Sequence, residues 1–495
     1  MRIINFYVDH FRSLSNIKLE ELGGLNVIVG YNGYGKTNLL TAIYLFIKNL
    51  GSGLEKRSIE DRNQEYMLLW KDYDINKPIT IGGTVEFSEE EVMKALGKSR
   101  KIRVEVINKI KYNNRFVEWD VERLAIDNSP PTRDNLEEIK QLFSFASQGI
   151  EYVPIFDQTY FDAVLRKMIE MNRSPINMRR KWYDFINLVG EVIPEIKGIE
   201  FWDSNKLVLN IQNLPIYIDL AASGFQRVIL MLFILWLSGR KILLLEEPEV
   251  NMYPTLQSRI MKLIKSWTDN GVFQVFITTH SPYVVSSQID NYIIMKKKNG
   301  VSSAIKVNLD DQLKTLLGIL RVNLSEILFD KIVILTSGLA EPSVVLNWLR
   351  RIGISNDELG IGIYKVSTDL ELQLWLRLRE LLGLDILFLG LCDKIDLSLK
   401  DYCVPLGREV ENYYTKSKLI DVIRKFGVYP DEKELRELTK EGDTYNWLVN
   451  VFRKRGIDYE KVRNSLGELV TMYDGVEMPK EMEILANKIK SLESI

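Results

Sequence analysis

The sequence has few of the residues that build disulfide frameworks and nitrogen- or sulfur-rich metal sites. Its 495 residues include two cysteines, Cys392 and Cys403, and two histidines, His10 and His280. Two cysteines are too few for a disulfide framework or a cysteine zinc site, and two histidines exclude histidine-rich metal chemistry. This composition predicts a chain that works in a reducing, cytoplasmic environment.

Long hydrophobic runs and an excess of one charge are also missing. The longest apolar run, residues 228–237, is well short of the ~20 residues that cross a bilayer. Charges interrupt the opening "MRIINFYVDHF", where a secretion signal needs an unbroken apolar region, so we expect no membrane partner. Since the net charge is −2, contact with nucleic acid would depend on local basic clusters. The candidates are "GKSRKIR" (97–103), "NMRRKW" (177–182) and "MKKKNG" (295–300), and solvated surface is the simpler interpretation of each.

The first informative segment is "LNVIVGYNGYGKTNLLTAIYLF", residues 25–46. An apolar strand leads into a glycine-rich loop and then into a helical pattern, which fits G-x-x-x-x-G-K-[ST] in its required context. The pattern contains Gly30, Gly33, Gly35, Lys36 and Thr37. Backbone N–H groups of such a loop surround a phosphate, the lysine contacts the β- and γ-phosphates, and the threonine hydroxyl binds Mg²⁺. The segment therefore predicts a nucleotide site, although a chance glycine-rich turn is the alternative.

Acidic residues follow a second apolar strand, in "RKILLLEEPEVNMYPTLQ" (240–257). Carboxylates at the end of a buried strand are costly unless a cation or ligand uses them. We expect Glu246 to hold the Mg²⁺ hydration shell and Glu247 to polarise the attacking water. One βαβ spacing later, "VFQVFITTHSPYVV" ends a strand at His280, which we expect to contact the γ-phosphate. A solvated acidic turn and a structural histidine are the alternatives.

The stretch "IDLAASGFQRVILMLFIL" (218–235) distinguishes ABC-type ATPases from other phosphate-loop proteins. It is similar to their signature motif, with Ser223 and Gly224 at the start of an apolar helix, where N–H groups can meet a γ-phosphate. Taken alone, Ser223 would be an ordinary helix cap. Its position shortly before the acidic strand favours the signature interpretation.

Together these segments resemble the ABC-type ATPases of the SMC/RecF kind, and most closely the OLD (overcoming lysogenization defect) family. "FYVDHFRSLSNIKL" (6–19) is similar to that family's opening strand pair, and "EEPEVNMYPTLQ" to its acidic motif and the following loop. The resemblance implies that ATP and Mg²⁺ are bound, with further nucleotide contacts from Arg12, Asn32 and Asn38.

The resemblance also implies a sensing glutamine, for which Gln148 and Gln158 are both candidates. One departure is visible, because family members commonly have histidines where this chain has Asn251 and Tyr253. In such ATPases the signature of one protomer completes the phosphate site of another. Each motif occurs once here, so the resemblance implies a homodimer or higher oligomer.

A second α/β pattern follows residue 321, with strands near 332–335, 361–366 and 385–396 and helices between them. It resembles the Toprim nuclease domain of OLD proteins, which holds Mg²⁺ with a glutamate after the first strand and a D-x-D pair after a later one. Here "VILTSGLAEPSVV" (333–345) has Ser337 at the glutamate position, and Glu341 comes about one helical turn too late.

The acidic pair departs from the Toprim pattern as well. Asp393 is present, but Ile395 replaces the second aspartate and Asp396 is shifted by one place. Glu409 and Glu411 remain as ligands for a second metal. We interpret the nuclease as degenerate. The alternatives are a rearranged active site that uses these four acids, or an unrelated α/β domain.

The sequence thus predicts an α/β fold with an ABC-type ATPase domain over residues 1–320, including a helical, dimerising insertion at about 155–215. A smaller Toprim-like domain over 328–416 and a helical region over 417–495 would follow. The predicted function is a Mg²⁺-dependent ATPase whose dimer opens and closes on DNA, in repair or anti-phage defence. The alternatives are an ATP-bound scaffold that captures DNA or an effector protein, and an ATP-regulated endonuclease.

Overall fold

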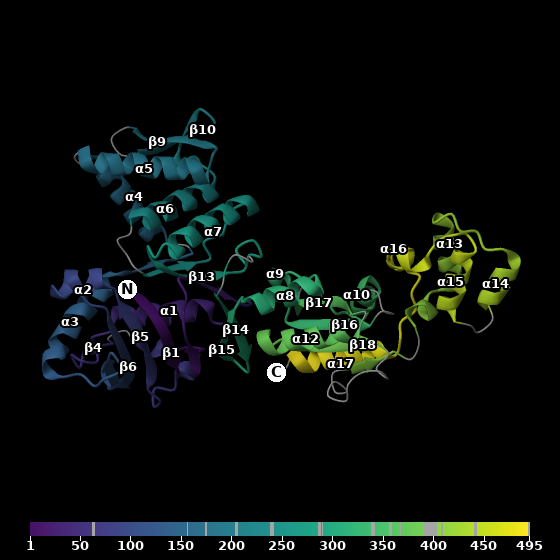
Figure 1. Ribbon diagram of the computed structural model, residues 1–495, viewed down its shortest axis with the longest axis horizontal. Helices are drawn as coiled ribbons and strands as arrows, with labels where there is room; N and C mark the ends of the chain where they lie inside the picture. The colour runs from purple at the N-terminus through teal and green to yellow at the C-terminus, as the bar shows by residue number, and fades with distance from the viewer. Residues whose placement is uncertain are drawn as a thin grey trace. The chain divides into compact units, whose positions relative to one another are not determined.

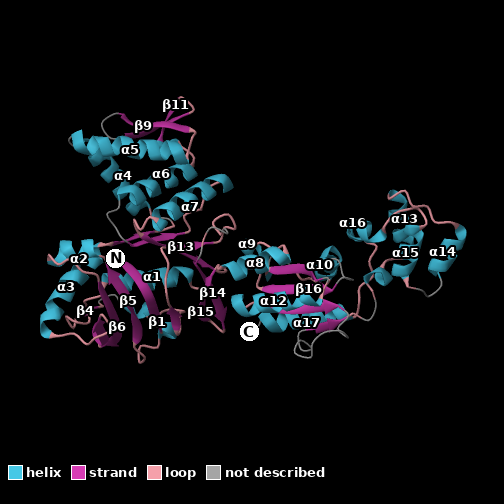
Figure 2. Ribbon diagram, in the orientation of Figure 1, coloured by secondary structure: helices cyan, strands magenta, loops and turns pink. Residues whose placement is uncertain are grey.

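The computed structural model describes residues 1–61, 65–155, 157–173, 176–202, 206–237, 242–285, 289, 291–337, 342–355, 359–366, 368–390, 403–406, 409–439 and 443–493. The chain divides into two compact units, Met1–Asp311 and Gln312–Ile495. We call them the N-terminal unit and the C-terminal unit. Figure 1 follows the chain through both, and Figure 2 distinguishes helices from strands.

A mostly parallel sheet organises the N-terminal unit. Its strand order is β15, β14, β3, β13, β12 and β8, with the bounds Val301–Asn308, Asn291–Lys298, Leu25–Val29, Gln274–Thr279, Ile242–Glu246 and Ile150–Val153. Only β15 is antiparallel to its neighbour. Strands β3 and β13 are buried along their whole length, as expected for a parallel sheet covered on both faces. The carboxyl ends of β3, β13, β12 and β8 therefore share one edge.

An antiparallel sheet forms the other half of this unit's core. Its order is β2, β1, β5, β6, β7 and β4, with the bounds Ile17–Leu19, Arg2–Asp9, Ile79–Phe87, Ile102–Asn113, Phe116–Ile126 and Ser58–Glu60. The alternating burial of β6 is typical of a strand with one face in the core. Side chains of this sheet, of α1 (Lys36–Lys48) and of the parallel sheet form one hydrophobic cluster. Within it, the rings of Phe6 and Phe46 pack edge to face at 5.8 Å.

The remaining helical segments of this unit are α2 (Glu89–Leu96), α3 (Arg133–Gln148), α4 (Gln158–Arg173), α5 (Ile176–Val192), α6 (Ser223–Leu237) and α7 (Pro254–Asp269), with the short 3₁₀ turns η1 (Tyr66–Leu69), η2 (Lys71–Tyr73) and η3 (Ile218–Leu220). Helix α6 is apolar on nearly all sides and is buried from Val228 to Leu235. It packs against α4 and α5 (Figure 1). A helix that is apolar all round needs such complete cover.

The predicted helical insertion at about 155–215 is helical only in its first half. Helices α4 and α5 are followed by an antiparallel sheet of β9 (Ile196–Trp202), β10 (Lys206–Ile211) and β11 (Leu214–Tyr217). The central strand buries Leu207, Val208 and Leu209 in succession. β-Branched and leucine side chains in a short apolar run fit a strand as well as a helix, and the neighbouring strands decide in favour of the sheet.

The C-terminal unit is built on a parallel sheet with the order β17, β16, β18 and β19, with the bounds Ile361–Val366, Ile332–Ser337, Asp385–Gly390 and Cys403–Pro405. Its described helical segments are α8 (Asp311–Leu320), α9 (Leu324–Ile327), α10 (Pro342–Arg351), α12 (Asp369–Leu382), η6 (Val410–Tyr413), α13 (Lys416–Lys425), α14 (Glu432–Thr439), α15 (Thr444–Arg453), α16 (Tyr459–Met472) and α17 (Glu481–Glu493). The alternating order of strands and helices over 332–390 agrees with the sequence pattern.

The parallel sheet and the following helices of this unit share one hydrophobic cluster. Helix α17 packs on β19, where Lys488 Nζ donates to Cys403 O at 3.1 Å.

The chain divides into its two compact units after Asp311, whereas the sequence suggested domain boundaries near 320 and 416. Among the described helices, none has both the length and the apolar composition to cross a membrane.

Candidate functional site

The loop between β3 and α1 has a backbone that suits glycine. Gly30, Gly33 and Gly35 have φ angles of 151°, 76° and 93°, which disfavour side chains. At Gly30, a Cβ atom would also lie 2.9 Å from Met295 O on the neighbouring strand. The loop therefore approaches β14 closely and leads into the first turn of α1. A helix N-terminus preceded by such a loop can bind a phosphate.

Lys36 is buried beneath this loop. Its Nζ donates to Gly30 O at 3.0 Å and Tyr31 O at 3.3 Å, and lies within hydrogen-bond distance of His280 Nε2. Burial lowers the pKa of Lys36 to about 8, and the nearby carboxylates, led by Glu247, partly offset that effect. The ammonium is therefore mostly charged at neutral pH, in a place where an anionic ligand would strengthen its hold on the proton.

Thr37 and Glu246 come together from α1 and the end of β12. Thr37 Oγ1 donates to Glu246 Oε1 at 2.6 Å, and the Tyr152 hydroxyl donates to Glu246 Oε2 at 2.9 Å. Burial, and then the Glu246 charge, raises the pKa of Tyr152, so this hydroxyl stays protonated. A hydroxyl and a carboxylate are the hard oxygen ligands that Mg²⁺ prefers. This pair fits a magnesium ion that accompanies a nucleotide.

Glu247 and His280 face each other at the same edge of the sheet. Glu247 Oε1 lies 3.2 Å from His280 Nε2. The backbone of Glu247 has a φ angle of 40°, and its N–H donates to Thr278 O and Oγ1, each at 3.1 Å. Burial, and then the Lys36 charge, lowers the pKa of His280, so the imidazole is neutral at pH 7. Its tautomer decides whether Nε2 accepts from Lys36 or donates to Glu247.

Sequence reasoning missed Glu249, which is 8% exposed. Its Oε1 accepts from Thr279 Oγ1 at 2.6 Å and from His280 N–H at 3.0 Å. Its Oε2 is buried and has no hydrogen-bond partner among the described residues. Burial raises the pKa of Glu249. In the sequence, Glu249 follows Glu246 and Glu247 closely, and no local pattern shows that it is buried and not part of a solvated acidic turn.

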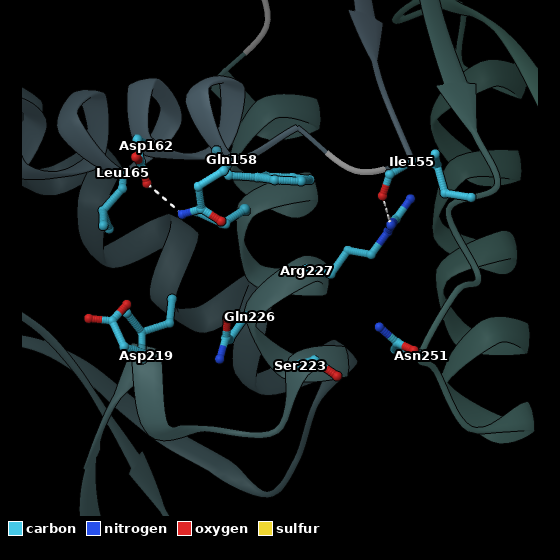
Figure 3. A pocket seen from close by; sticks show the side chains of 12 residues that line it. Ile155, Gln158, Asp162, Leu165, Asp219, Ser223, Gln226, Arg227 and Asn251 are labelled. Carbon is cyan, nitrogen blue, oxygen red and sulfur yellow. Dashed lines mark hydrogen bonds between the residues drawn. The ribbon is translucent and has the colours of Figure 1, made fainter.

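Arg227 was also missed, although it connects three parts of the site. Its Nη2 donates to Glu246 O and Glu247 O, each at 3.0 Å, and its Nη1 donates to Ile155 O (Figure 3). Burial lowers the pKa of Arg227, and the neighbouring glutamates, led by Glu249, oppose that effect. One guanidinium thus joins helix α6 to the acidic loop and to the segment after β8. The only hint in the sequence is its distance of one helical turn from Ser223.

Ser223 and Gly224 begin α6 beside the loop that follows the acidic strand. A Cβ atom on Gly224 would lie 2.3 Å from Asn251 O, so a larger residue would force these segments apart. Ser223 is exposed and lines a cavity of about 140 Å³, drawn in Figure 3. The lining residues are Ile155, Gln158, Phe161, Asp162, Leu165, Ile218, Asp219, Ser223, Gln226, Arg227, Leu230 and Asn251. Among the described contacts, none brings Ser223 or Gly224 to Lys36 of the same chain.

The two candidate glutamines lie at opposite ends of β8. Gln148 ends α3 before the strand begins, whereas Gln158 starts α4 after the strand ends. Since Val153 pairs with Leu245, Gln158 follows the same edge of the sheet as Glu246. Its Nε2 donates to Asp162 Oδ1 at 2.8 Å (Figure 3). Of the two glutamines, Gln158 is therefore the one that follows the carboxyl end of the strand.

The three polar residues expected to add nucleotide contacts lie around the phosphate loop. Arg12 Nη1 donates to Asn38 Oδ1 at 3.1 Å, and burial lowers the pKa of this arginine. Asn32 is exposed within the loop. The basic stretch "MKKKNG" also reaches the loop, because Lys297 Nζ donates to Gly33 O at 3.0 Å. This lysine belongs to a candidate stretch for DNA contact, which stays a prediction, and it is hydrogen-bonded to the phosphate loop.

Asp393, Ile395, Asp396 and Glu341 lie outside the described residues, as does the side chain of Ser337 at the end of β16.

Glu411 is 1% exposed and pairs with Arg463, whose Nε lies 2.7 Å from Glu411 Oε1. The Tyr459 hydroxyl donates to the same oxygen at 3.1 Å. Among the described residues, the cation beside Glu411 is therefore a guanidinium, and metal binding by Glu411 stays a prediction. Burial, and then Glu411, raises the pKa of Glu409. In the described part of this unit, no group of three or more His, Cys, Asp or Glu side chains is placed to hold a metal.

Several known proteins are similar to part of the chain. The chain is 22% identical over 237 residues to the "DNA replication and repair protein RecF" of Shewanella sp. (strain MR-4), covering 41% of this chain and 63% of that protein. It is 21% identical over 320 residues to an "ATP/GTP phosphatase" of Helicobacter pylori, covering 55% of this chain and 84% of that protein.

Among solved structures, an Smc head bound to the C-terminal winged-helix domain of ScpA covers 63% of this chain and 100% of its own, with 15% identity and a TM-score of 0.45. The SMC head domain from Thermotoga maritima covers 62% and 100%, with 16% identity and a TM-score of 0.37.

One family model matches the chain over two overlapping segments, residues 1–148 and 132–285, and it describes an AAA ATPase domain. These segments include the phosphate loop, the acidic strand and His280. They also cover more than half of the 495 residues. The chain therefore belongs to the AAA ATPase domain family.

Proposed function

We propose that this chain binds and hydrolyses ATP with Mg²⁺ as an ABC-type ATPase of the OLD kind, and that a homodimer opens and closes on DNA as the nucleotide turns over. One observation carries the enzymatic part of the proposal. Three neighbouring strands, β3, β13 and β12, end at one edge of the sheet in Lys36 and Thr37, in His280, and in Glu246 and Glu247. In open parallel sheets, ligands bind at this edge.

Each residue has a role that follows from its position. Lys36 would hold the β- and γ-phosphates, while Thr37 and Glu246 would hold Mg²⁺. The metal, when bound, withdraws negative charge from the phosphates. Glu247 would orient and polarise the attacking water, and His280, a neutral imidazole at pH 7, would contact the γ-phosphate. Gln158, which follows the end of β8, would be the glutamine that senses the bound nucleotide.

Dimerisation is proposed from the separation of the two motifs. The phosphate loop is held by β3 and α1, whereas Ser223 is exposed at the N-terminus of another helix and has no described contact with Lys36. Each motif occurs once in the sequence. A second copy of the chain, which presents its Ser223 across the bound nucleotide, would complete the site. ATP would then hold two protomers together until hydrolysis releases them.

Action on DNA is proposed from the named function of the RecF relatives, which match 41% of this chain. DNA repair and anti-phage defence, in the cytoplasm and with or without an effector protein, are the settings we propose. We further propose that the C-terminal unit is a degenerate Toprim-like domain, since Ser337 and Ile395 replace two expected carboxylates. The pairing of Glu411 with Arg463 supports the loss of metal binding.

The test compares the full-length wild type with Glu247→Gln for ATP turnover and molecular mass, each with ATP and Mg²⁺ and with or without DNA. We expect turnover in the wild type and an ATP-bound dimer that persists in Glu247→Gln, because the amide cannot polarise the water. A scaffold with incidental turnover would keep its DNA capture in Glu247→Gln. Plasmid nicking with Mg²⁺ that disappears in Asp393→Ala would instead establish the endonuclease.

A further inference from the structure

We propose that Glu249 is a positioning residue for hydrolysis, whose Oε1 fixes His280 between Lys36 and Glu247 by accepting two hydrogen bonds. This inference rests on the proposed ATPase function. It concerns a residue with no direct contact to the phosphate loop among the described hydrogen bonds. Glu249 would act through the main chain of His280 and not through the phosphates.

The position of the imidazole depends on the end of β13. Nε2 of His280 contacts both Lys36, from α1, and Glu247, from the acidic loop. Its own backbone N–H donates to Glu249 Oε1 at 3.0 Å, and the preceding Thr279 Oγ1 donates to the same oxygen at 2.6 Å. Two successive residues of one strand end are therefore bound to one atom of the neighbouring loop.

Further hydrogen bonds extend this connection on both sides. Thr279 Oγ1 also accepts from Ser281 N–H at 2.9 Å, and Ser281 Oγ donates to Gln257 Oε1 in α7 at 2.5 Å. On the other side, Glu247 N–H is bound to Thr278. The acidic loop and the histidine loop are thus joined residue by residue, and Glu249 supplies the bonds that reach the histidine itself.

The two oxygens of Glu249 indicate that hydrogen-bond acceptance, and not charge, is its contribution. Both donors reach Oε1, whereas Oε2 is buried without a partner among the described residues. A buried carboxylate with an unpaired oxygen destabilises a fold. A glutamine would keep the accepting oxygen and remove the charge, so it should preserve the position of His280.

The test measures steady-state ATP turnover and nucleotide affinity for Glu249→Ala, Glu249→Gln and the wild type. We expect Glu249→Ala to lower kcat about 10- to 100-fold, since small displacements of a catalytic group have effects of this size. Nucleotide affinity should change less than about threefold, because Lys36 and Thr37 stay on α1. Glu249→Gln should keep kcat within about threefold of the wild type. Adding His280→Gln to Glu249→Ala should cost little more than either change alone.

Two further variants control for general damage to the fold. Glu195 also has a buried oxygen without a partner among the described residues, and it lies outside the phosphate site. Glu195→Ala should leave kcat unchanged. If Glu249→Ala does not fold, Thr279→Val removes one of the two donors while keeping the side-chain volume, and it should give a smaller loss of kcat in the same direction.

A second readout does not depend on turnover. The chain contains two histidines, His10 and His280, so histidine-selective NMR labelling gives two imidazoles, and His280→Gln assigns them. The His280 resonances should move in Glu249→Ala and stay near their wild-type positions in Glu249→Gln. If the wild type has no turnover, the ATPase proposal fails while the NMR result still decides the positioning. Equal effects of the two Glu249 variants, on kcat or on the resonances, would overturn the inference.

Discussion

The two parallel sheets of this molecule are both followed by acidic residues, and they differ in what those acids contact. After β12, Glu246 accepts from two hydroxyls, and Glu247 faces an imidazole beside a buried ammonium. In the C-terminal unit, Glu411 instead pairs with a guanidinium at 2.7 Å. The first arrangement leaves carboxylates for a cation and water, whereas in the second Oε1 of Glu411 already lies beside a guanidinium. A buried carboxylate after a strand therefore indicates a ligand-binding site only when the residues around it do not already neutralise its charge.

The largest expected effect is on the first sheet, through Lys36→Met. Turnover should fall at least about 100-fold, since a charged contact to the transferred phosphate is lost. Because burial lowers the pKa of Lys36 to about 8, the folded chain holds this proton less tightly than the unfolded chain, and charging the lysine at neutral pH lowers the stability. The melting temperature without nucleotide should stay equal or rise, while the shift on adding ATP and Mg²⁺ disappears.

A matched control for this prediction is Lys306→Met. Burial also lowers the pKa of Lys306, whose Nζ donates to Glu21 O, but that lysine lies away from the phosphate loop. It should retain both turnover and the nucleotide-dependent shift in melting temperature. A variant of Lys36 that still melts higher with ATP would show that the ammonium is not part of the nucleotide site.

In the C-terminal unit, we expect a substitution at the buried ion pair to change the stability of the fold and not the ATP turnover. Arg463→Met leaves Glu411 buried without its cation, which costs about 3–5 kcal/mol when one partner of a buried ion pair is removed. Chemical denaturation should show the loss in a transition that added nucleotide does not shift.

The double variant Arg463→Met with Glu411→Met should recover most of that stability, because no charge remains buried. If Mg²⁺ or Mn²⁺ stabilised Arg463→Met alone, Glu411 would be a metal ligand after all, and the contrast between the two sheets would disappear.

Much of the first site could be predicted because its motifs are local. The spacing from Gly30 to Thr37 and the run Glu246–Glu247 each specify their chemistry within a few residues. The choice between Gln148 and Gln158 needed the pairing of Val153 with Leu245, which no local pattern contains. Glu411 meets Arg463, and Glu249 meets His280, only after the chain has folded.

The sequence predicted a helical insertion over about 155–215, and its second half is a sheet for a related reason. Leu207, Val208 and Leu209 are apolar in succession, so neither a period of two nor one of 3.6 is visible in so short a run. Pairing with β9 and β11 supplies the missing information. Local sequence patterns were thus enough where one short segment holds the residues together. They were not enough where pairing with a second segment decides the structure.

A third prediction tests this lesson at the end of β8. Gln158→Ala should lower ATP turnover about 10- to 100-fold, a size typical of residues that orient the ligands of a metal site. Gln148→Ala is the matched control, because it changes the same residue type at the opposite end of the same strand. Turnover should stay within about twofold of the wild type in Gln148→Ala. If the two substitutions had equal effects on turnover, the position of a glutamine at the carboxyl end of β8 would not matter for the site.

The smallest expected effect is the pH dependence contributed by His280. Burial, and then Lys36, lowers the pKa of its imidazole in the folded chain. Between that lowered value and about 6.5, the usual value for histidine, the unfolded chain binds more protons than the folded chain. Stability therefore rises with pH in this window and falls as the solution is acidified below about 6.5. In urea denaturation at a series of pH values, His280→Gln should show a shallower loss of stability on acidification than the wild type. An unchanged slope in His280→Gln would mean that the imidazole is not held neutral beside Lys36.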